Sequence, residues 1–305
     1  MDHPSKNLIV LAMISLVVTC GKKEKVKITG SETMHHMMDI IASDYMKKKR
    51  KVSVDVKGGG SAEGIEELVR GQTNIALSSR GLIDRELLDL EKQGKIGQIV
   101  IAYDGTAIIT HPENKVDKIN LHSASDLFSG IISNWKELGG DDLPVQILIR
   151  NDKSGTAYYF REHILRKKDL GEEEFRKNRF NDFAKTSKIV KDNDEMADFI
   201  SGNKGAVGYM GMGSAEVDAK DKVKPLKYSK TEKDEPVIAS IENVYNRKYR
   251  LARPLYMIYI TNSGNKIDEF VSFVTSEEGQ LSIRKSGYLR STLPEVEVKG
   301  YANRK

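Results

Sequence analysis

Arg150, Ser154 and Thr156 lie close together in one stretch, residues 145–165, with Gly155 between the two hydroxyl residues. Serine and threonine hydroxyls donate hydrogen bonds, and arginine adds a permanent positive charge on a planar fork. A short apolar run precedes them and apolar residues at helical spacing follow, so a strand is predicted to pass into a helix here. A helix start has unpaired N–H groups and a partial positive charge, so these parts together suit a phosphate-like oxyanion. The alternative is that a hydroxyl only caps the helix while Arg150 pairs with a carboxylate.

The same arrangement of strand, small hydroxyl loop and helix occurs twice earlier in the chain. Residues 25–29 alternate like a strand and are followed by Gly-Ser-Glu-Thr at 30–33 and a helical run. Residues 52–56 alternate likewise and are followed by Gly-Gly-Gly-Ser at 58–61 and a second helical run. Ligands in α/β folds bind beyond the carboxyl ends of strands, so three such junctions that converge on one anion would form a site.

The elements that must hold these loops are predicted to be repeated strands and helices as far as Asp104. Residues 83–93 are expected to be helical, with Leu87, Leu88 and Leu90 as apolar residues, and residues 98–102 are expected to form a strand. Tyr-Asp-Gly at 103–105 is expected to interrupt this strand before it resumes at 107–110. An interrupted strand of this kind can cross between two lobes, and residues 253–260 are predicted to be the second crossing.

The remainder of the chain is predicted to form a second lobe and a closing helix. Residues 171–200 are charged and expected to be helical, with a polar run at 192–195 capping a helix that continues to Ile200. Residues 205–210 are predicted to be a buried strand, and the charged segment 218–236 is predicted to be exposed. Residues 268–284 are expected to form one amphipathic helix that bears Phe273 and Leu281, and residues 295–305 a tail.

Composition favours a soluble globular protein and excludes several classes of function. The chain has 305 residues, 39% hydrophobic and 30% charged, and its net charge of +5 does not indicate nucleic-acid binding. The cationic run at 47–51 is interpreted as a solvated helix end. The chain has no P-loop, no GxSxG elbow, no HExxH and no CxxC, and His35 and His36 are adjacent rather than spaced to share a metal. No histidine lies in the three hydroxyl loops to serve as a base, so we expect binding rather than catalysis, with no cofactor and no metal.

Several short motifs in a fixed order make the chain resemble a known family. They are GSET at 30–33, GGGS at 58–61, SSR at 78–80, YDG at 103–105, R-x-D-x-SGT at 150–156, AVGYM at 206–210 and RPLYMIYI at 253–260. This order resembles the solute-binding protein of the phosphate ABC transporter, and the resemblance covers nearly everything after Cys20. It implies an α/β, two-lobed periplasmic-binding-protein fold of the second type, with two crossings between lobes and the ligand in the cleft. The first lobe would comprise residues 22–106 and 251–305, and the second residues 107–250.

The resemblance also implies a set of phosphate ligands. The positions that match the family's ligand residues are Thr33, Ser61, Arg150, Ser154, Gly155 and Thr156. Ser79 stands where many members have an aspartate that accepts the proton on phosphate. We expect Asp104 to replace it, with Arg80 as its ion-pair partner or as a second ligand cation. Without such an acceptor, phosphate would be separated poorly from sulfate.

The function that follows is binding of inorganic phosphate and delivery to the permease subunits of an ABC transporter, by a monomer that is not an enzyme. Two alternatives stay open. One is a receptor for another oxyanion, such as sulfate or molybdate. The other is an envelope hydrolase of phosphate esters that uses Ser154 or Thr156.

The amino terminus is predicted to be a lipoprotein signal peptide, residues 1–20. A hydrophobic segment at 7–18 leads to Val-Val-Thr-Cys, which resembles a bacterial lipobox, although Thr19 departs from the usual glycine or alanine. Cys20, the only cysteine in the sequence, would carry the lipid and tie an exported protein to a membrane of the cell envelope, on the periplasmic side or at the cell surface. The alternative is an uncleaved hydrophobic anchor that ends in a free thiol.

Overall fold

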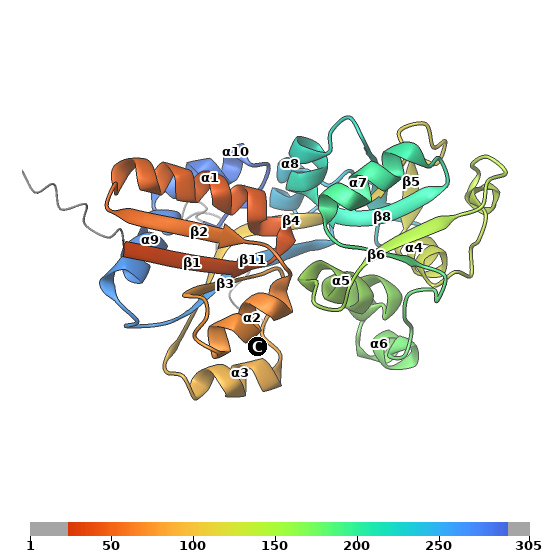
Figure 1. The fold of residues 1–305 in the computed structure, drawn as a ribbon. Helices are drawn as coiled ribbons and strands as arrows, with labels where there is room; N and C mark the ends of the chain where they lie inside the picture. Colours follow the sequence, from red (N-terminus) through yellow and green to blue (C-terminus); the bar gives the residue numbers. More distant parts are fainter. Residues whose placement is uncertain (1–23, 292–305) are drawn as a thin grey trace, which may run out of the picture.

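The computed structural model describes residues 24–291, so the predicted signal peptide, Cys20 and the predicted tail lie outside the described residues. Two lobes lie side by side, and two long strands run between them (Figure 1). None of the helices within residues 24–291 combines the length and the apolar character that crossing a membrane requires.

One ten-stranded sheet runs through both lobes. Its spatial order is β2 (Val52–Lys57), β1 (Glu24–Gly30), β3 (Ile75–Ser78), β11 (Ala252–Ile260), β4 (Ile96–Thr110), β8 (Ala206–Gly211), β6 (Gln146–Arg150) and β7 (Lys188–Val190). Two short strands, β9 (Lys224–Pro225) and β12 (Leu289–Arg290), also pair with β4, while β5 (Lys118–Asn120) and β10 (Lys227–Ser229) form a separate pair. The strands that precede the three hydroxyl loops, β1, β2 and β6, have parallel neighbours, so helices follow each of them.

Helices cover both faces of the sheet. In the first lobe they are α1 (Glu32–Lys48), α2 (Ser61–Val69), α3 (Asp84–Glu91), α9 (Asn265–Thr275) and α10 (Glu277–Lys285). In the second lobe they are α4 (Leu121–Phe128), α5 (Gly155–Phe160), α6 (Glu172–Asn178), α7 (Asn193–Gly202) and α8 (Ile241–Tyr245). A π-helical turn, Arg161–Leu165, continues α5 and buries Ile164 and Leu165, as the apolar spacing in this stretch predicts.

The predicted interruption at residues 103–105 is wrong, because β4 is one continuous strand of 15 residues. What changes there is the neighbour of β4. It pairs with β11 as far as Gly105 and with β8 from Thr106 onward. A glycine next to an aspartate in the sequence suggests that the strand is interrupted. The backbone hydrogen bonds of β4 nevertheless continue, because β8 replaces β11 as the neighbouring strand.

Buried apolar residues form separate cores in the two lobes. One large cluster contains buried residues between positions 26 and 102 and between 255 and 288, and a small cluster on the opposite sheet face includes Ile65, Ala76 and Ile258. The other large cluster lies between positions 107 and 251, with Leu289 added from the carboxyl end. The exact lobe boundaries, near residues 106 and 250, stay a prediction that these clusters support.

Two other expectations about elements need correction. The carboxyl-terminal helix is two helices, because Ser276 ends α9 and its side chain caps α10; Leu281 is 43% exposed. Residues 171–200 are not continuously helical, since the short strand β7 separates α6 from α7, although Asp192 does cap α7 through the Glu195 N–H. The predicted helix at 83–93 is confirmed as α3, in which Leu90 is buried while Leu87 and Leu88 are exposed.

The predicted exposed segment at 218–236 also has a buried part. Leu226 is fully buried and Tyr228 nearly so; Leu226 precedes β10, and Tyr228 lies within it, opposite Ile119 of β5.

Gly64 lets α2 pack directly on the end of β1, which brings two of the hydroxyl loops together. A Cβ at this position would lie 2.4 Å from the Thr29 carbonyl oxygen and 2.7 Å from Cα of Gly30. Real Cβ atoms do not approach backbone so closely, so an added methyl group would have to push α2 away from the strand.

We therefore predict that Gly64→Ala destabilises the protein by about 1–3 kcal/mol through overpacking, although alanine favours a helix interior by about 1 kcal/mol. Gly202→Ala is the matched control, because Gly202 ends α7 with nothing near its would-be Cβ; it should stay within about 0.5 kcal/mol of the original chain. Urea unfolding measures both. Equal stability of the two variants would contradict the packing argument.

Candidate functional site

The three predicted junctions meet where the two lobes touch. Thr33 in α1 and Thr156 in α5 place their Oγ1 atoms 2.8 Å apart. Ser61, the first residue of α2, places its Oγ 3.3 Å from the Oγ of Ser79, which follows β3. Gly155 lies against this pair, because a Cβ there would be 2.2 Å from the Ser61 Oγ. Hydroxyls from both lobes thus gather at one buried place, as the strand–loop–helix pattern predicts.

Ser79 is held in this cluster by its backbone as well as its side chain. Its N–H donates to the Ser61 Oγ at 3.1 Å, and its own Oγ accepts from the Ser31 hydroxyl at 3.1 Å. Ser79 is fully buried and carries no charge. It can therefore contact an anion through its hydroxyl but cannot provide a carboxylate.

The helix starts at the site keep backbone N–H groups free of side-chain caps. Neither Ser31 at α1 nor Gly60 at α2 makes a capping hydrogen bond through its side chain. Ser154 does cap α5, by accepting from the Ala157 N–H at 3.2 Å. The capping alternative for the third loop is thus correct for the Ser154 oxygen, whose O–H hydrogen is still available as a donor.

Arg150 ends β6 and is 4% exposed. Its Nη1 donates to Asn193 Oδ1 at 3.2 Å, and its backbone N–H donates to the hydroxyl of Tyr209. The alternative that Arg150 simply pairs with a carboxylate is not supported, since its side-chain partner is an amide. Burial lowers the pKa of the Arg150 guanidinium, which is the expected effect of placing a cation in a low-dielectric interior.

Asp104 is fully buried and pairs with Arg253, which the sequence did not identify as a site residue. Arg253 Nη2 lies 3.1 Å from Asp104 Oδ2, and Oδ1 of the same carboxylate accepts from the Met212 N–H at 2.9 Å. The two residues face each other directly across the β4–β11 ladder. The signal that could have found Arg253 is an arginine at the start of the second predicted crossing strand.

Arg253 also bonds to the hydroxyl cluster. The same Nη2 donates to Thr156 Oγ1 at 2.9 Å and approaches Thr33 Oγ1 at 3.4 Å. The guanidinium donates to both oxygens, and one of the two threonine hydroxyls donates to the other, so one O–H hydrogen of this pair is left for another acceptor. Arg253 therefore connects the buried carboxylate to hydroxyls of both lobes.

Two buried guanidinium nitrogens, Arg150 Nε and Arg253 Nη1, have no hydrogen-bond partner within residues 24–291. A buried charged donor without a partner carries a large desolvation cost. Native structures rarely retain such groups unless a ligand or ion completes them. Donors of this kind beside a set of hydroxyls are suited to an anion with several oxygens.

Arg80 is not the ion-pair partner of Asp104, so this half of the expectation is wrong; its role as a second ligand cation stays a prediction. Its guanidinium makes a bidentate pair with Glu86 of α3, at 2.6 and 2.7 Å, and also bonds to the Gly81 carbonyl oxygen. The guanidinium lies 5.2 Å from the ring centre of Tyr158 in the second lobe. Arg80 thus joins the two lobes beside the cluster through an aromatic contact, with its charge already matched by Glu86.

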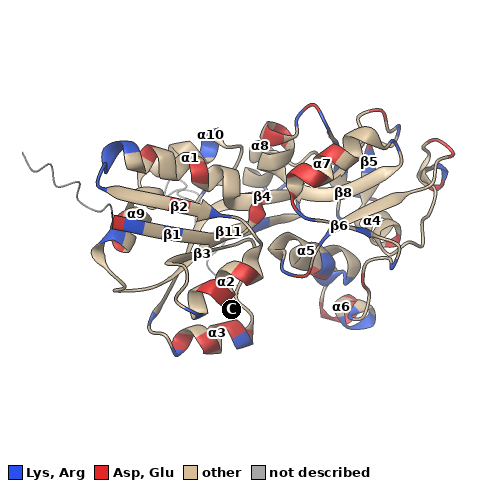
Figure 2. Ribbon diagram, in the orientation of Figure 1, with Lys and Arg blue, Asp and Glu red and all other residues tan. Residues whose placement is uncertain are grey.

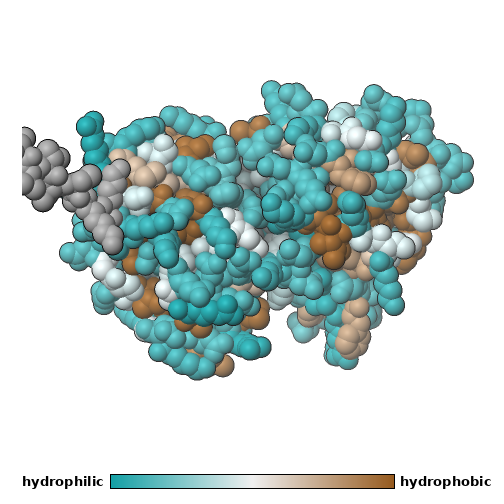
Figure 3. Space-filling view, viewed as in Figure 1, coloured by the Kyte–Doolittle hydropathy of each residue, from teal (hydrophilic) through white to brown (hydrophobic). Residues whose placement is uncertain are grey.

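A polar cavity of about 800 Å³ opens from the boundary between the lobes. Its lining includes Glu32, His36, Gly59, Asn193 and Asp218, so both lobes contribute. Figure 3 shows hydrophilic surface along much of the seam between the two lobes. Asn193, the partner of Arg150, connects this cavity to the buried cluster.

Comparisons with known proteins agree with this geometry. The model of the PBP superfamily domain matches residues 19–278. The phosphate-binding protein PstS of Borreliella burgdorferi is 29% identical over 290 residues, covering 92% of this chain and 96% of the relative. The PstS of Pseudomonas aeruginosa is 29% identical over 279 residues, covering 85% and 81%.

A solved structure shares both fold and sequence with this chain. It is a Clostridium perfringens chain assigned as a phosphate ABC transporter substrate-binding protein, with bound phosphate. It has a TM-score of 0.75 and 31% identity, and the match covers 88% of this chain and all of that one.

The pKa of Asp104 gives a testable signature of this site. Burial raises this pKa to about 6, against the opposing effect of Arg253. The folded state then binds the proton more tightly than the unfolded chain, whose aspartates titrate near pH 4. The contribution of Asp104 to stability is therefore complete below about pH 4 and falls as pH rises to about 6.

We predict that the difference in unfolding free energy between the original chain and Asp104→Asn falls over this window, by on the order of 3 kcal/mol. Denaturant unfolding at several pH values between 4 and 7 measures it. A difference that stays constant, or one that grows with pH, would contradict a raised pKa.

Proposed function

The chain belongs to the PBP superfamily, and from this premise we propose that it binds inorganic phosphate and delivers it to the permease of an ABC transporter. The relatives named PstS and the phosphate-bound neighbour support this proposal. The single observation on this chain that carries it is a buried guanidinium nitrogen without a partner within residues 24–291, Arg253 Nη1, on an arginine that bonds to hydroxyls of both lobes. A second such nitrogen, Arg150 Nε, lies at the end of β6.

We assign the direct contacts with the ligand to one set of residues and exclude Arg80 from it. The direct contacts are Thr33, Ser61, Ser79, Arg150, Ser154, Gly155 through its N–H, Thr156 and Arg253. Arg80 is reassigned from a ligand to a residue that holds the lobes together, because Glu86 occupies its guanidinium. An anion that touches hydroxyls of both lobes would favour the closed arrangement, because it binds that state more tightly than an open one.

Asp104 is the residue that we propose to select phosphate. Phosphate still carries a proton near neutral pH, whereas sulfate does not. A carboxylate has about four acceptor positions. Within residues 24–291, Asp104 accepts from the Met212 N–H and from Nε and Nη2 of Arg253, which leaves room for one more hydrogen. It would accept the phosphate proton and repel a fully ionised oxyanion.

The hydrolase alternative has less support from the site. The hydroxyls of the cluster bond to other hydroxyls, to backbone and to Arg253 within residues 24–291, and none of these partners is a general base. Incubation with a generic phosphomonoester tests this alternative. Release of phosphate that depends on Ser154 or Thr156 would favour the hydrolase.

The test of the main proposal is calorimetric titration of anion-stripped protein with phosphate, sulfate and molybdate. Phosphate should bind most tightly. Tighter binding of sulfate or molybdate would replace phosphate by another oxyanion within the same fold.

We further propose that the protein is exported and acts as a monomer tethered through lipid on Cys20. The support is the hydrophobic run at 7–18 followed by the only cysteine of the sequence. Mass spectrometry of the native protein should find a diacyl or triacyl cysteine as its first residue. An intact Met1 would refute cleavage and lipidation together.

Arg150→Ala should weaken phosphate binding while leaving the fold intact. Hydrogen bonds to charged groups contribute about 1.5–3 kcal/mol each, so the dissociation constant should rise by at least about ten-fold. Arg161→Ala is the matched control, because Arg161 follows on the same helical segment and already pairs with Asp152 and Asp182. Titration of both variants with phosphate checks the assignment, and original affinity in Arg150→Ala would remove this residue from the site.

Asp104→Asn should weaken phosphate binding and relax the rejection of sulfate, because an amide can donate where a carboxylate only accepts. The measurement is the ratio of the phosphate and sulfate dissociation constants, in the variant and in the original chain, at one pH. If Asp104 only neutralises Arg253, affinity for both anions should change alike. An unchanged ratio would therefore exclude Asp104 as the proton acceptor.

A further inference from the structure

We propose that one end of the first lobe contacts an anionic lipid surface. This basic end consists of Lys25 and residues 47–51, all of which are lysine or arginine. The proposal takes its orientation from the proposed lipid anchor on Cys20, and it adds a second, electrostatic contact between the protein and the membrane.

Two segments that are separate in the sequence meet at the basic end. The Glu24 N–H at the start of β1 donates to the Lys51 carbonyl oxygen at 3.0 Å, and Lys25 lies beside Ser53 in the parallel ladder. The turn between α1 and β2 is thus adjacent to the point where the described chain begins. Figure 2 shows basic residues concentrated at this turn, on the side of the first lobe where β1 begins.

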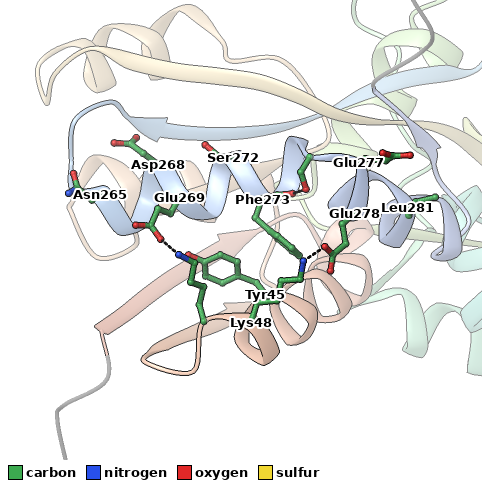
Figure 4. A pocket seen from close by; sticks show the side chains of 12 residues that line it. Tyr45, Lys48, Asn265, Asp268, Glu269, Ser272, Phe273, Glu277, Glu278 and Leu281 are labelled. Atoms are coloured by element: carbon green, nitrogen blue, oxygen red, sulfur yellow. Dashed lines mark hydrogen bonds and ion pairs between the residues drawn. The ribbon is translucent and has the colours of Figure 1, made fainter.

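The charges at the basic end are exposed and only partly matched. All five residues at 47–51 are exposed. Within residues 24–291, Lys25 pairs with Asp55, Lys47 with Asp44, Lys48 with Glu278 and Lys49 with Glu269. Figure 4 shows Lys48 reaching Glu278 across the groove between α1 and the two carboxyl-terminal helices.

Arg50 and Lys51 have no ion pair in the described part of the chain. They follow the end of α1. The negative end of the helix dipole stabilises the charges of Lys47 and Lys48 in the last turn, but its effect does not extend to Arg50 and Lys51 beyond that turn. Exposed ion pairs such as those of Lys48 and Lys49 contribute little to stability. Their lysines can therefore exchange a carboxylate for a lipid phosphate at low cost.

The length of the tether brings this end close to the membrane. Only residues 20–23 separate the proposed lipid from β1, and four extended residues span at most about 14 Å. Electrostatic attraction at physiological salt acts over about 8 Å. A cation near an anionic bilayer strengthens binding by roughly five-fold, so unpaired cations here would add measurably to one lipid anchor.

The basic end lies at the opposite end of the strands from the proposed phosphate site. β1 runs from Glu24 at the basic end to Gly30 beside the hydroxyl cluster, a distance of about 20 Å for a strand of this length. Contact with lipid at the basic end would therefore leave the boundary between the lobes uncovered, so the lobes could still open and close around the ligand.

The test uses the mature chain with Cys20→Ser, so that no lipid masks the electrostatic contact. The probe is co-sedimentation with vesicles of phosphatidylcholine alone or mixed with phosphatidylglycerol. We expect binding to the mixed vesicles only, lost at high salt. In the same background, Arg50→Glu with Lys51→Glu should reduce this binding by at least about ten-fold.

The matched control is Lys233→Glu with Lys248→Glu, which changes net charge equally at exposed positions of the second lobe. This control should keep binding within about two-fold of the parent chain, because its charges lie away from the basic end. Equal loss in both double variants, or equal binding to both vesicle types, would overturn the proposal. Phosphate titration of the same preparations reports separately on the proposed function, since neither double variant touches the hydroxyl cluster.

Discussion

The buried ion pair between Arg253 and Asp104 is the interaction on which the rest of the site depends. Removing two charges from water is costly, and a buried pair is tolerated only when further hydrogen bonds satisfy it. Here the Met212 N–H adds a hydrogen bond to the carboxylate, and Thr33 and Thr156 accept from the guanidinium. The pair lies on β4 and β11, the two strands that join the lobes, so one interaction fixes the crossings and orients hydroxyls from both sides.

Features that depend on residues close together in the sequence could be predicted, and features that depend on distant residues could not. The three strand–loop–helix junctions are local, because apolar alternation, a small polar loop and helical spacing all occur within about 20 residues of each other. Those junctions, the two-lobed fold and the buried strand at 205–210 are therefore confirmed. Arg253 was missed because its partner is 149 residues away, and only the register of β4 against β11 brings the two together.

The errors have the same origin. Arg80 was expected to pair with Asp104, but its partner is Glu86, six residues later at the start of α3. The sequence alone offers no reason to prefer the carboxylate of Glu86 to that of Asp104. Residues 103–105 suggest a break because glycine and aspartate are poor strand formers. The strand continues since β8 replaces β11 as its neighbour. Residues 268–284 were expected to form one helix because apolar residues recur at helical spacing on both sides of Ser276. The capping of α10 by Ser276 divides this segment into two helices.

The charges around the cleft show which forces the site can use. Within the described chain, the cavity between the lobes has six acidic lining residues, namely Glu32, Asp39, Glu63, Asp192, Asp194 and Asp218, against the lysines Lys57 and Lys191. An acidic mouth does not attract an anion from a distance. The net charge of +5 therefore does not explain anion binding, because the excess of basic residues does not line this cavity. Affinity would have to come from short-range contacts with Arg150, Arg253 and the hydroxyls, which burial shields from salt. The acidic rim then acts as a barrier, which an anion overcomes only if the buried donors fit it.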